Sequence, residues 1–461
     1  MARAPPVQPV HGPPHPLAEI SRRLVADHGL DATLLFAAAT SPPSAQYLAL
    51  AASAPDGVDL AALPAPPADA LPPSAPVRVR AEHAVASSIP RVREVARSLA
   101  AAAPLAALVV DMIGTPARQV AAELGVPSYV FFTSPWMTLS LFLHLPELDA
   151  SRSGEHLLDA TEPICLPGYA PIHAHELPRS MLADRSSESY TGLLAMAKEF
   201  RGVDGILVNT FRDLEPAVGD GLEGLEVPVH PVGPLVWARP ARVDRDHECL
   251  RWLDQQPHRS VVYVSFGSGG TLTWQQTAEL ALGLELSQHR FVWVVKKPHQ
   301  DTASGSFFGT SQGEETTMDY LPKGFIERTR GIGLVIQAWA PQPLILAHAS
   351  VRCFVTHCGW NSALESILNA VPMIAWPLFA EQHLNASMLE IQVGVATRIR
   401  TGPDRLIRKE EIARAIHRVM EGQEAERMMK RASELREKSL YDLSKVGCTT
   451  QALAQIADTW K

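Results

Sequence analysis

The residues with the clearest chemical meaning lie between Trp339 and Gln382. An indole at the start of this segment offers a flat surface on which an aromatic base can stack. A glycine-containing turn in its middle leads into a helix, and the N-terminus of a helix favours phosphate. Carboxylate and amide side chains further along can hydrogen-bond sugar hydroxyl groups. The segment therefore predicts a site that can bind an aromatic base, phosphate and sugar hydroxyl groups.

The candidates for contact with the nucleoside come first in this segment. Trp339 follows the predicted strand Leu334–Gln337 at its carboxyl end, where the indole can stack on a base at roughly 1–3 kcal/mol. Gln342 could hydrogen-bond the nucleoside, and the backbone of Ala340 could pair with the base. For Trp339 taken alone, a place in the hydrophobic core is the structural alternative.

The run His357–Ser362 joins a predicted strand to a predicted helix and is the candidate phosphate site. Gly359 permits the tight turn, and Asn361 or Ser362 can cap the helix. The N–H groups and the positive dipole end at that point suit phosphate, and His357 adds a further donor. A plain helix cap and a core histidine are the structural alternatives for Asn361 and His357.

Two neighbouring patterns bear on the same site. The glycine-rich turn Ser265–Gly270 contributes Ser268 to the phosphate cradle, but it lacks both the GxGxxG spacing and the lysine of a P-loop. Cys353, His357 and Cys358 lie close in sequence without a second pair of ligands, which disfavours zinc there. Glu365 falls one helical turn after Asn361, so its carboxylate can accept from both ribose hydroxyls or neutralise the helix start.

The whole segment resembles the signature box of plant secondary-metabolite glycosyltransferases, the nucleotide-sugar-dependent family 1 enzymes. The stretches HPVGPLV and YVSFGSGGTL are also similar to that family. The resemblance implies that Glu381 and Gln382 bind hexose hydroxyls and that Trp360 assists through its backbone. A glutamine at the final position resembles glucose-using members, so we expect UDP-glucose as donor, with no separate cofactor and no metal.

The resemblance also implies direct displacement at the anomeric carbon with inversion, assisted by a general base. The family uses a histidine after its first strand, oriented by an aspartate, and Asp111 at the end of strand Ala107–Val110 matches that aspartate. A gap-free pairing puts Pro13 at the position of the base, and proline cannot transfer a proton. We therefore favour His15 over His11 as the base, and a third alternative is that neither histidine serves.

The first strand of the family has no clear counterpart. The segment Pro5–Pro14 contains five prolines and no apolar run, which predicts that it is not a central strand. A protein that binds a UDP-sugar without transferring it is therefore the alternative to an active glucosyltransferase. An epimerase of similar fold is a more distant third.

Aromatic residues of the first half are candidates for the acceptor pocket: Trp136, Met137, Phe142 and His144. Each of them could equally lie on the side of an amphipathic helix that packs against the protein core. Their stretch and the run VDGILVNTF resemble the phenol-glucosylating branch, whose acceptors include hydroquinone and phenylpropanoid alcohols. We therefore expect O-transfer to a small phenol, with N- or S-transfer left open.

The composition excludes several other classes of protein. Apolar residues at 46% and charged residues at 20% fit a soluble globular chain, and the net charge of −8 argues against a nucleic-acid partner. No stretch approaches the ~18 consecutive apolar residues of a membrane helix. Five scattered cysteines favour reduced thiols in the cytoplasm. We expect a monomer.

Short apolar runs alternate with longer amphipathic stretches, which is typical of βαβ units and parallel sheets. The predicted strands are Ala32–Ala38, Ala107–Asp111, Ser128–Phe132, Gly205–Asn209, Val261–Ser265, Phe291–Lys296, Leu334–Gln337, Cys353–Thr356 and Met373–Trp376. The predicted helices include Leu17–Asp27, Pro90–Ala102, Pro116–Leu124, Trp274–Ser287, Pro343–Ala347 and Asn361–Leu368.

The resemblance implies an α/β protein of the GT-B fold, with two Rossmann-like domains whose parallel sheets face a cleft. Pro228–Arg245 carries several prolines and is predicted to be the linker. We expect an acceptor-binding domain at 1–236 and a nucleotide-sugar-binding domain at 237–461. The last helix, about Thr449–Trp460, is expected to pack back on the first domain.

Overall fold

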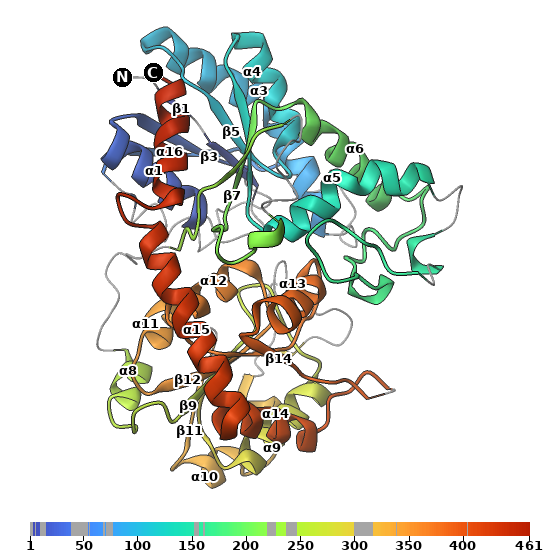
Figure 1. Cartoon of the computed structure of the whole chain (residues 1–461), viewed down its shortest axis with the longest axis vertical. Helices are drawn as coiled ribbons and strands as arrows, with labels where there is room; N and C mark the ends of the chain where they lie inside the picture. The colour runs from blue at the N-terminus through green and yellow to red at the C-terminus, as the bar shows by residue number, and fades with distance from the viewer. Residues whose placement is uncertain are drawn as a thin grey trace. The chain divides into compact units, whose positions relative to one another are not determined.

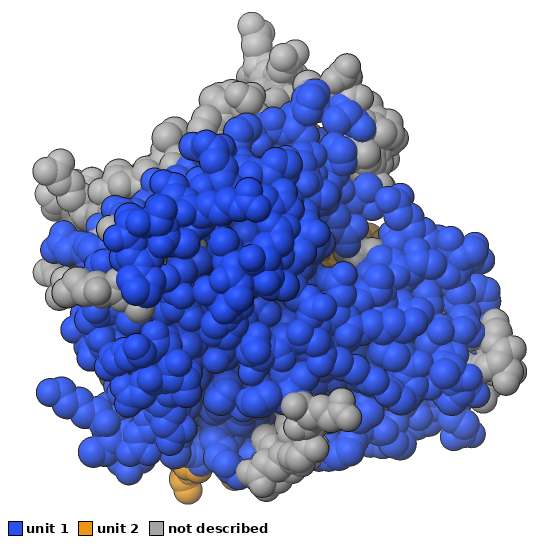
Figure 2. Space-filling model, turned by 90° about the horizontal axis from the view of Figure 1, so that it is seen from above, with its two compact units in different colours: residues 1–174, 180–242, 439–461 blue, residues 175–179, 243–438 orange. Residues whose placement is uncertain are grey.

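The computed structural model describes residues 3–4, 6–9, 15–37, 54, 56–67, 70, 77–151, 156–159, 162–218, 227–236, 247–298, 317–337, 339–402 and 404–461. The chain divides into two compact units, which Figure 2 distinguishes by colour. Residues 1–174, 180–242 and 439–461 form the first unit, and residues 175–179 and 243–438 form the second.

The first unit is built on an eight-stranded parallel sheet in the order β1-β3-β2-β5-β6-β7-β8, with β4 also paired to β3. The strands are β1 (Arg3–Ala4), β2 (Pro6–Pro9), β3 (Asp31–Ala37), β4 (Val58–Leu63), β5 (Leu108–Asp111), β6 (Ser128–Phe132), β7 (Gly205–Val208) and β8 (Val229–Pro231). The helices are α1 (His15–His28), α3 (Val77–Ala102), α4 (Arg118–Leu124), α5 (Trp136–Ser151), α6 (Glu188–Glu199) and α16 (Cys448–Thr459).

The prediction that the proline-rich N-terminus is not a central strand is wrong. Strand β2 lies between β3 and β5, and Val7 pairs with Leu35 on one side and Val110 on the other. Prolines are confined to the two ends of this short strand, Pro6 and Pro9, so the residues between them keep the N–H groups that a ladder needs. Position within the strand, rather than the number of prolines, decides whether a strand forms.

Two further boundaries differ from prediction because packing outweighs proline. Helix α3 passes through Pro90, the residue at which the sequence predicted its start. Residues Ala81, Val85 and Ser88 before that proline are buried at helical spacing, which holds the earlier turns against the unit. The predicted linker Pro228–Arg245 likewise begins with β8, an edge strand paired to β7, and residues 237–246 lie outside the described part.

Two helices near opposite ends of the chain, α1 and α16, contribute to the core of the first unit. Helix α16 contacts α1 and β8, and Figure 1 shows α16 beside α1. Leu453, Ile456 and Trp460 join the same buried cluster as Leu17 and Leu24 of α1. The Trp460 ring meets Tyr129 of β6 edge-on, with ring centroids 5.1 Å apart.

The second unit has a six-stranded parallel sheet in the order β11-β10-β9-β12-β13-β14. The strands are β9 (Val261–Ser265), β10 (Arg290–Val295), β11 (Gly333–Gln337), β12 (Val351–Thr356), β13 (Met373–Ala375) and β14 (Ala396–Arg398). The helices are α8 (Glu248–Leu253), α9 (Trp274–Ser287), α10 (Phe325–Thr329), α11 (Gln342–Leu346), α12 (Trp360–Leu368), α13 (Gln382–Met388) and α14 (Lys409–Met420), and α15 (Gly422–Asp442) then carries the chain back into the first unit.

Helices α9 and α14 pack together and bury a common apolar surface on the core of this sheet. Gly283 of α9 allows the close approach, because a Cβ there would lie 2.6 Å from the Cβ of Ile412 on α14. The predicted strands agree with the observed ones to within two residues, which confirms the α/β class. Within the described residues, no helix combines the length and the apolar character required to cross a membrane.

Candidate functional site

The predicted donor residues of the second unit all follow carboxyl ends of strands in one sheet. Because the strands are parallel, those ends share one edge, which is where α/β sheets bind ligands. Ser268 follows β9, Trp339, Ala340 and Gln342 follow β11, His357 follows β12, and Glu381 and Gln382 follow β13. Trp360, Asn361, Ser362 and Glu365 lie on α12, which begins directly after the β12 turn.

Gln342 holds three parts of this edge together. Its Nε2 donates to Ser362 Oγ at 3.0 Å and to Glu365 Oε2 at 2.7 Å. Its Oε1 accepts from the Tyr263 hydroxyl at 3.3 Å. Burial raises the pKa of Glu365 to about 7, although the hydrogen bond from Gln342 acts in the opposite direction. This carboxyl group therefore gains and loses its proton near neutral pH.

His357 is wedged between two glycines. A Cβ at Gly267 would lie 2.5 Å from its Nε2, and a Cβ at Gly359 would lie 2.4 Å from the same atom. The next residue, Cys358, adopts a positive φ of 62°, which is strained for a residue with a side chain. Burial, and then the charge of Lys296, lower the pKa of His357 to about 3, so the imidazole is neutral. Its Nδ1 is buried without a hydrogen-bond partner among the described residues.

Lys296, directly after β10, belongs to this group, and sequence reasoning missed it. Its ammonium group donates to the carbonyl oxygen of Gly267 and, at 2.6 Å, to that of Ser268. Burial lowers the pKa of Lys296 to about 8. In the sequence it is one of two adjacent lysines after a strand, and no pattern tells which of them turns toward the glycine-rich loop.

The start of α12 differs by one residue from prediction. The helix begins at Trp360 with Gly359 as its N-cap, so Asn361 and Ser362 lie inside the first turn and are not caps. A glycine N-cap has no side chain with which to satisfy the N–H groups of that turn. The positive dipole end of α12 therefore lies beside His357, and such a position favours an anion.

Trp339 and Gln382 occupy opposite environments. The Trp339 side chain is 63% exposed, so the core alternative for this tryptophan is wrong, while Ala340 beside it is buried. Gln382 is buried and its Oε1 accepts from the N–H groups of Leu378 at 2.9 Å and Phe379 at 3.0 Å. That amide thus fixes the loop after β13, with Glu381 as the N-cap residue of α13.

In the first unit, Asp111 ends β5 and is buried. Its Oδ1 accepts from the N–H groups of Ile113 at 3.1 Å and Gly114 at 2.7 Å. Burial raises its pKa well above the usual range against the effect of those hydrogen bonds. His15 is the first residue of α1, but its side chain is not described, and His11 lies outside the described residues.

The acceptor candidates lie on α5, whose first turn is anchored by a residue that sequence reasoning missed. Glu215 accepts from the backbone N–H groups of Trp136 at 3.0 Å and Met137 at 2.8 Å. Phe142 is buried and stacks on Phe200, so its ring takes part in core packing. Trp136 is also buried, and its Nε1 has no hydrogen-bond partner within the described part of the chain. Glu215 carried no motif in the sequence that could have identified it.

Comparison with known proteins gives consistent matches. The family model described as UDP-glucoronosyl and UDP-glucosyl transferase matches residues 238–439. Hydroquinone glucosyltransferase of Rauvolfia serpentina is 43% identical over 97% of this chain and 95% of its own length. The structure of Phytolacca americana UGT2 with UDP-2fluoro-glucose and pterostilbene has a TM-score of 0.89 and 38% identity, covering 100% of this chain and 99% of that one.

A UDP-glucosyltransferase from Polygonum tinctorium capable of glucosylating indoxyl, in complex with 3,4-dichloroaniline, has a TM-score of 0.90 and 38% identity. This match covers 100% of the present chain and 99% of that structure. Agreement over whole chains, together with two parallel α/β sheets, confirms the predicted GT-B class.

The contact between His357 and Gly359 gives a testable prediction. Gly359 has an ordinary φ of −59°, so Gly359→Ala acts through its Cβ, which must displace a buried imidazole. We expect a loss of about 1–3 kcal/mol in the free energy of unfolding, measured by urea titration with circular dichroism. Gly331→Ala is the matched control, because a Cβ there meets no atom within 4 Å.

Loss of the N-cap preference is a competing explanation for such an effect. Gly359→Ser separates the two causes, since serine is a good N-cap residue but carries the same Cβ. Equal stability of Gly359→Ser and the wild type would contradict the steric explanation.

Proposed function

The chain belongs to the family of UDP-glucoronosyl and UDP-glucosyl transferases, and on this basis we propose that it transfers glucose from UDP-glucose to the hydroxyl group of a small phenol. The observation that carries the proposal is the convergence of the candidate donor residues on one sheet edge, in a chain 43% identical to a hydroquinone glucosyltransferase over nearly its whole length. We propose roles for the individual residues below.

The nucleoside is assigned to the residues after β11 and to α12. The exposed indole of Trp339 is free of the core and can stack on uracil, and the backbone of Ala340 can pair with the base edge. Glu365 is positioned by Gln342 and would accept hydrogen bonds from the ribose hydroxyls as a carboxylate. Because the pKa of Glu365 is about 7, its neutral and ionised forms are both populated at neutral pH, and hydrogen bonds donated by the ribose hydroxyls would favour the ionised form.

The diphosphate is assigned to the start of α12 and the glycine-rich turn. Asn361 and Ser362 lie in the first helical turn, where N–H groups and the dipole favour an anion. Ser268 and the neutral His357 add donors, and the unpartnered Nδ1 of that histidine is a buried polar atom that a ligand would satisfy. Lys296 supplies a positive charge beside them. With this charge in place, we expect transfer to need no metal.

The hexose is assigned to the loop after β13. Glu381 can accept from sugar hydroxyls, and Gln382 can donate through its Nε2, because its Oε1 is already bonded to the loop backbone. Trp360 would contribute its backbone. A glutamine at this last position supports glucose as the transferred sugar.

For catalysis we propose that His15 removes the proton of the acceptor hydroxyl while its oxygen attacks the anomeric carbon and UDP departs with the bonding electrons. Asp111 would hold the imidazole and stabilise its protonated form. Strands β2 and β5, which lead to His15 and Asp111, are neighbours in the sheet, and this supports the pairing. Trp136, with its unpartnered buried Nε1, is the best-supported acceptor contact.

We propose that residues 1–236 bind the acceptor and residues 237–461 bind the donor. We also propose that the protein acts as a monomer in the cytoplasm, in keeping with five cysteines that are all free thiols. The alternative of a binding protein without catalysis rested on a damaged first strand and a damaged catalytic base. The presence of β2 removes the first argument and leaves only the identity of the base to be tested.

The first test supplies UDP-glucose and hydroquinone to the purified chain. We expect one glucoside and UDP in equal amounts by liquid chromatography, and His15→Ala should lower kcat by about 10²–10⁴-fold with UDP affinity unchanged. His28→Ala, at the other end of α1, is the control. UDP binding without product on any phenol would favour the non-catalytic alternative, and conversion of UDP-glucose without acceptor would favour an epimerase.

Lys296 gives a second test, which separates diphosphate from nucleoside binding. We expect Lys296→Met to weaken UDP binding by roughly tenfold, because a hydrogen-bonded charge is lost, while uridine binding stays unchanged. Isothermal titration calorimetry measures both ligands, and Lys297→Met is the matched control. An equal loss for uridine would contradict a role at the diphosphate.

Glu365→Gln gives a third test through pH. Burial raises the folded-state pKa of Glu365 to about 7, so the wild type loses stability as the pH rises from the unfolded value near 4.5 to about 7. The variant has no such loss. It should gain only about 1–2 kcal/mol relative to the wild type between pH 5 and pH 8 in urea titrations, because solvent reaches part of the side chain and screens the effect. The same variant should bind UDP more weakly at pH 8, and unchanged affinity would contradict the ribose assignment.

A further inference from the structure

Three potential metal ligands meet in the second unit at the edge opposite the donor site. His289 lies immediately before β10, whereas the donor residues follow the carboxyl ends of the strands. His417 lies in the last turn of α14, and Glu421 is the C-cap residue of that helix. Sequence reasoning did not find this cluster, because His289 and His417 are far apart in the chain.

The three ligand atoms form a nearly equilateral triangle. His289 Nε2 lies 3.0 Å from Glu421 Oε1 and 3.3 Å from His417 Nδ1, and the remaining edge, from His417 Nδ1 to Glu421 Oε1, is 3.4 Å. A point equidistant from the three atoms lies about 1.9 Å from each, slightly less than the ~2.0–2.1 Å of Zn–N and Zn–O bonds. An ion just outside the plane of the triangle therefore satisfies all three distances without movement of the chain.

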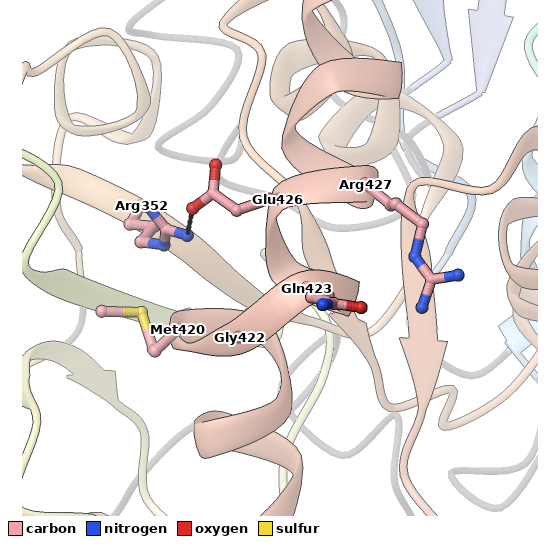
Figure 3. A pocket seen from close by; sticks show the side chains of 6 residues that line it. All are labelled: Arg352, Met420, Gly422, Gln423, Glu426 and Arg427. Atoms are coloured by element: carbon pink, nitrogen blue, oxygen red, sulfur yellow. Dashed lines mark hydrogen bonds and ion pairs between the residues drawn. The ribbon is translucent and has the colours of Figure 1, made fainter.

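The surroundings favour a cation. The C-terminus of a helix carries a partial negative charge, and α14 ends at this triangle. Arg352, a cation whose charge acts on His289, is itself paired with Glu426 at 2.7 Å. Figure 3 shows that pair on the wall of the neighbouring pocket, which Met420 and Gly422 on either side of Glu421 also line.

We propose that His289, His417 and Glu421 form a binding site for a zinc-type divalent transition ion. Two imidazoles and one carboxylate suit zinc and its neighbours, whereas calcium and magnesium prefer oxygen ligands alone. With three protein ligands, the fourth position is open to water. The ion would join the end of α14 to the start of β10, so its role would be to stabilise the second unit and would be separate from sugar transfer.

The test uses the full-length protein, freed of metal with a chelator that is then removed. Zinc is titrated in competition with a chromophoric chelator, for the wild type, His417→Ala and Glu421→Gln. We expect one zinc per wild-type chain, and at least roughly tenfold weaker binding in each variant. His348→Ala is the matched control, since His348 forms a similar surface pair with Asp254 at 3.1 Å but has no third ligand atom in the cluster. Its zinc affinity should equal that of the wild type.

Two further measurements, a cobalt spectrum and a melting temperature, test whether the three residues bind the ion. Cobalt should give the visible spectrum of a four- or five-coordinate ion with the wild type and not with His417→Ala, and zinc should raise the melting temperature of the wild type and not that of His417→Ala. Equal zinc binding by the wild type and His417→Ala would overturn the proposal, and the triangle would then be a hydrogen-bonded cluster without metal. Magnesium binding as tight as that of zinc would overturn the assignment of the ion.

Discussion

Every strand of the sheet in the second unit runs in the same direction, so all their carboxyl ends, and the side chains that follow them, share one edge. The side chains that follow β9, β10 and β12 must therefore fit into a small volume. Glycine fits at positions 267 and 359 in this crowded volume, because the imidazole of His357 fills the space that a Cβ would take at either position. The candidate donor residues are brought together by this geometry.

Crowding at the edge also sets the charges of the site. Burial acts on each ionisable group in the same sense, toward its neutral form: it raises the pKa of Glu365, and it lowers the pKa of both His357 and Lys296. A diphosphate would reverse the effect on Lys296, since a nearby anion favours the ammonium form. Burial thus keeps the net charge of these three side chains small, and Lys296 is the one whose charge a neighbouring anion would strengthen.

The sequence predicts the strands well because they depend on local signals, and the same signals place the candidate donor residues after those strands. An apolar run marks a strand, and polar residues directly after it, such as His357 or Glu381, must lie at its carboxyl end. Lys296 and Glu215 could not be found in this way. Each acts through backbone groups of a distant segment, Lys296 on the loop after β9 and Glu215 on the first turn of α5. Such contacts depend on tertiary structure, and no spacing in the chain records them.

The N-terminal segment shows how sheet register can outweigh composition. Arg3 and Ala4 of β1 pair with Asp31 and Ala32, and Val7, Gln8 and Pro9 of β2 pair with Leu35, Phe36 and Ala37. The offset in residue number is the same for both strands, so β1 and β2 continue one line along β3. Pairing to β3 and β5 on both sides then offsets the hydrogen bonds that the prolines cannot donate. Because β2 pairs with β5, and β5 ends at Asp111, the first strand of the chain lies directly beside the strand that carries this aspartate.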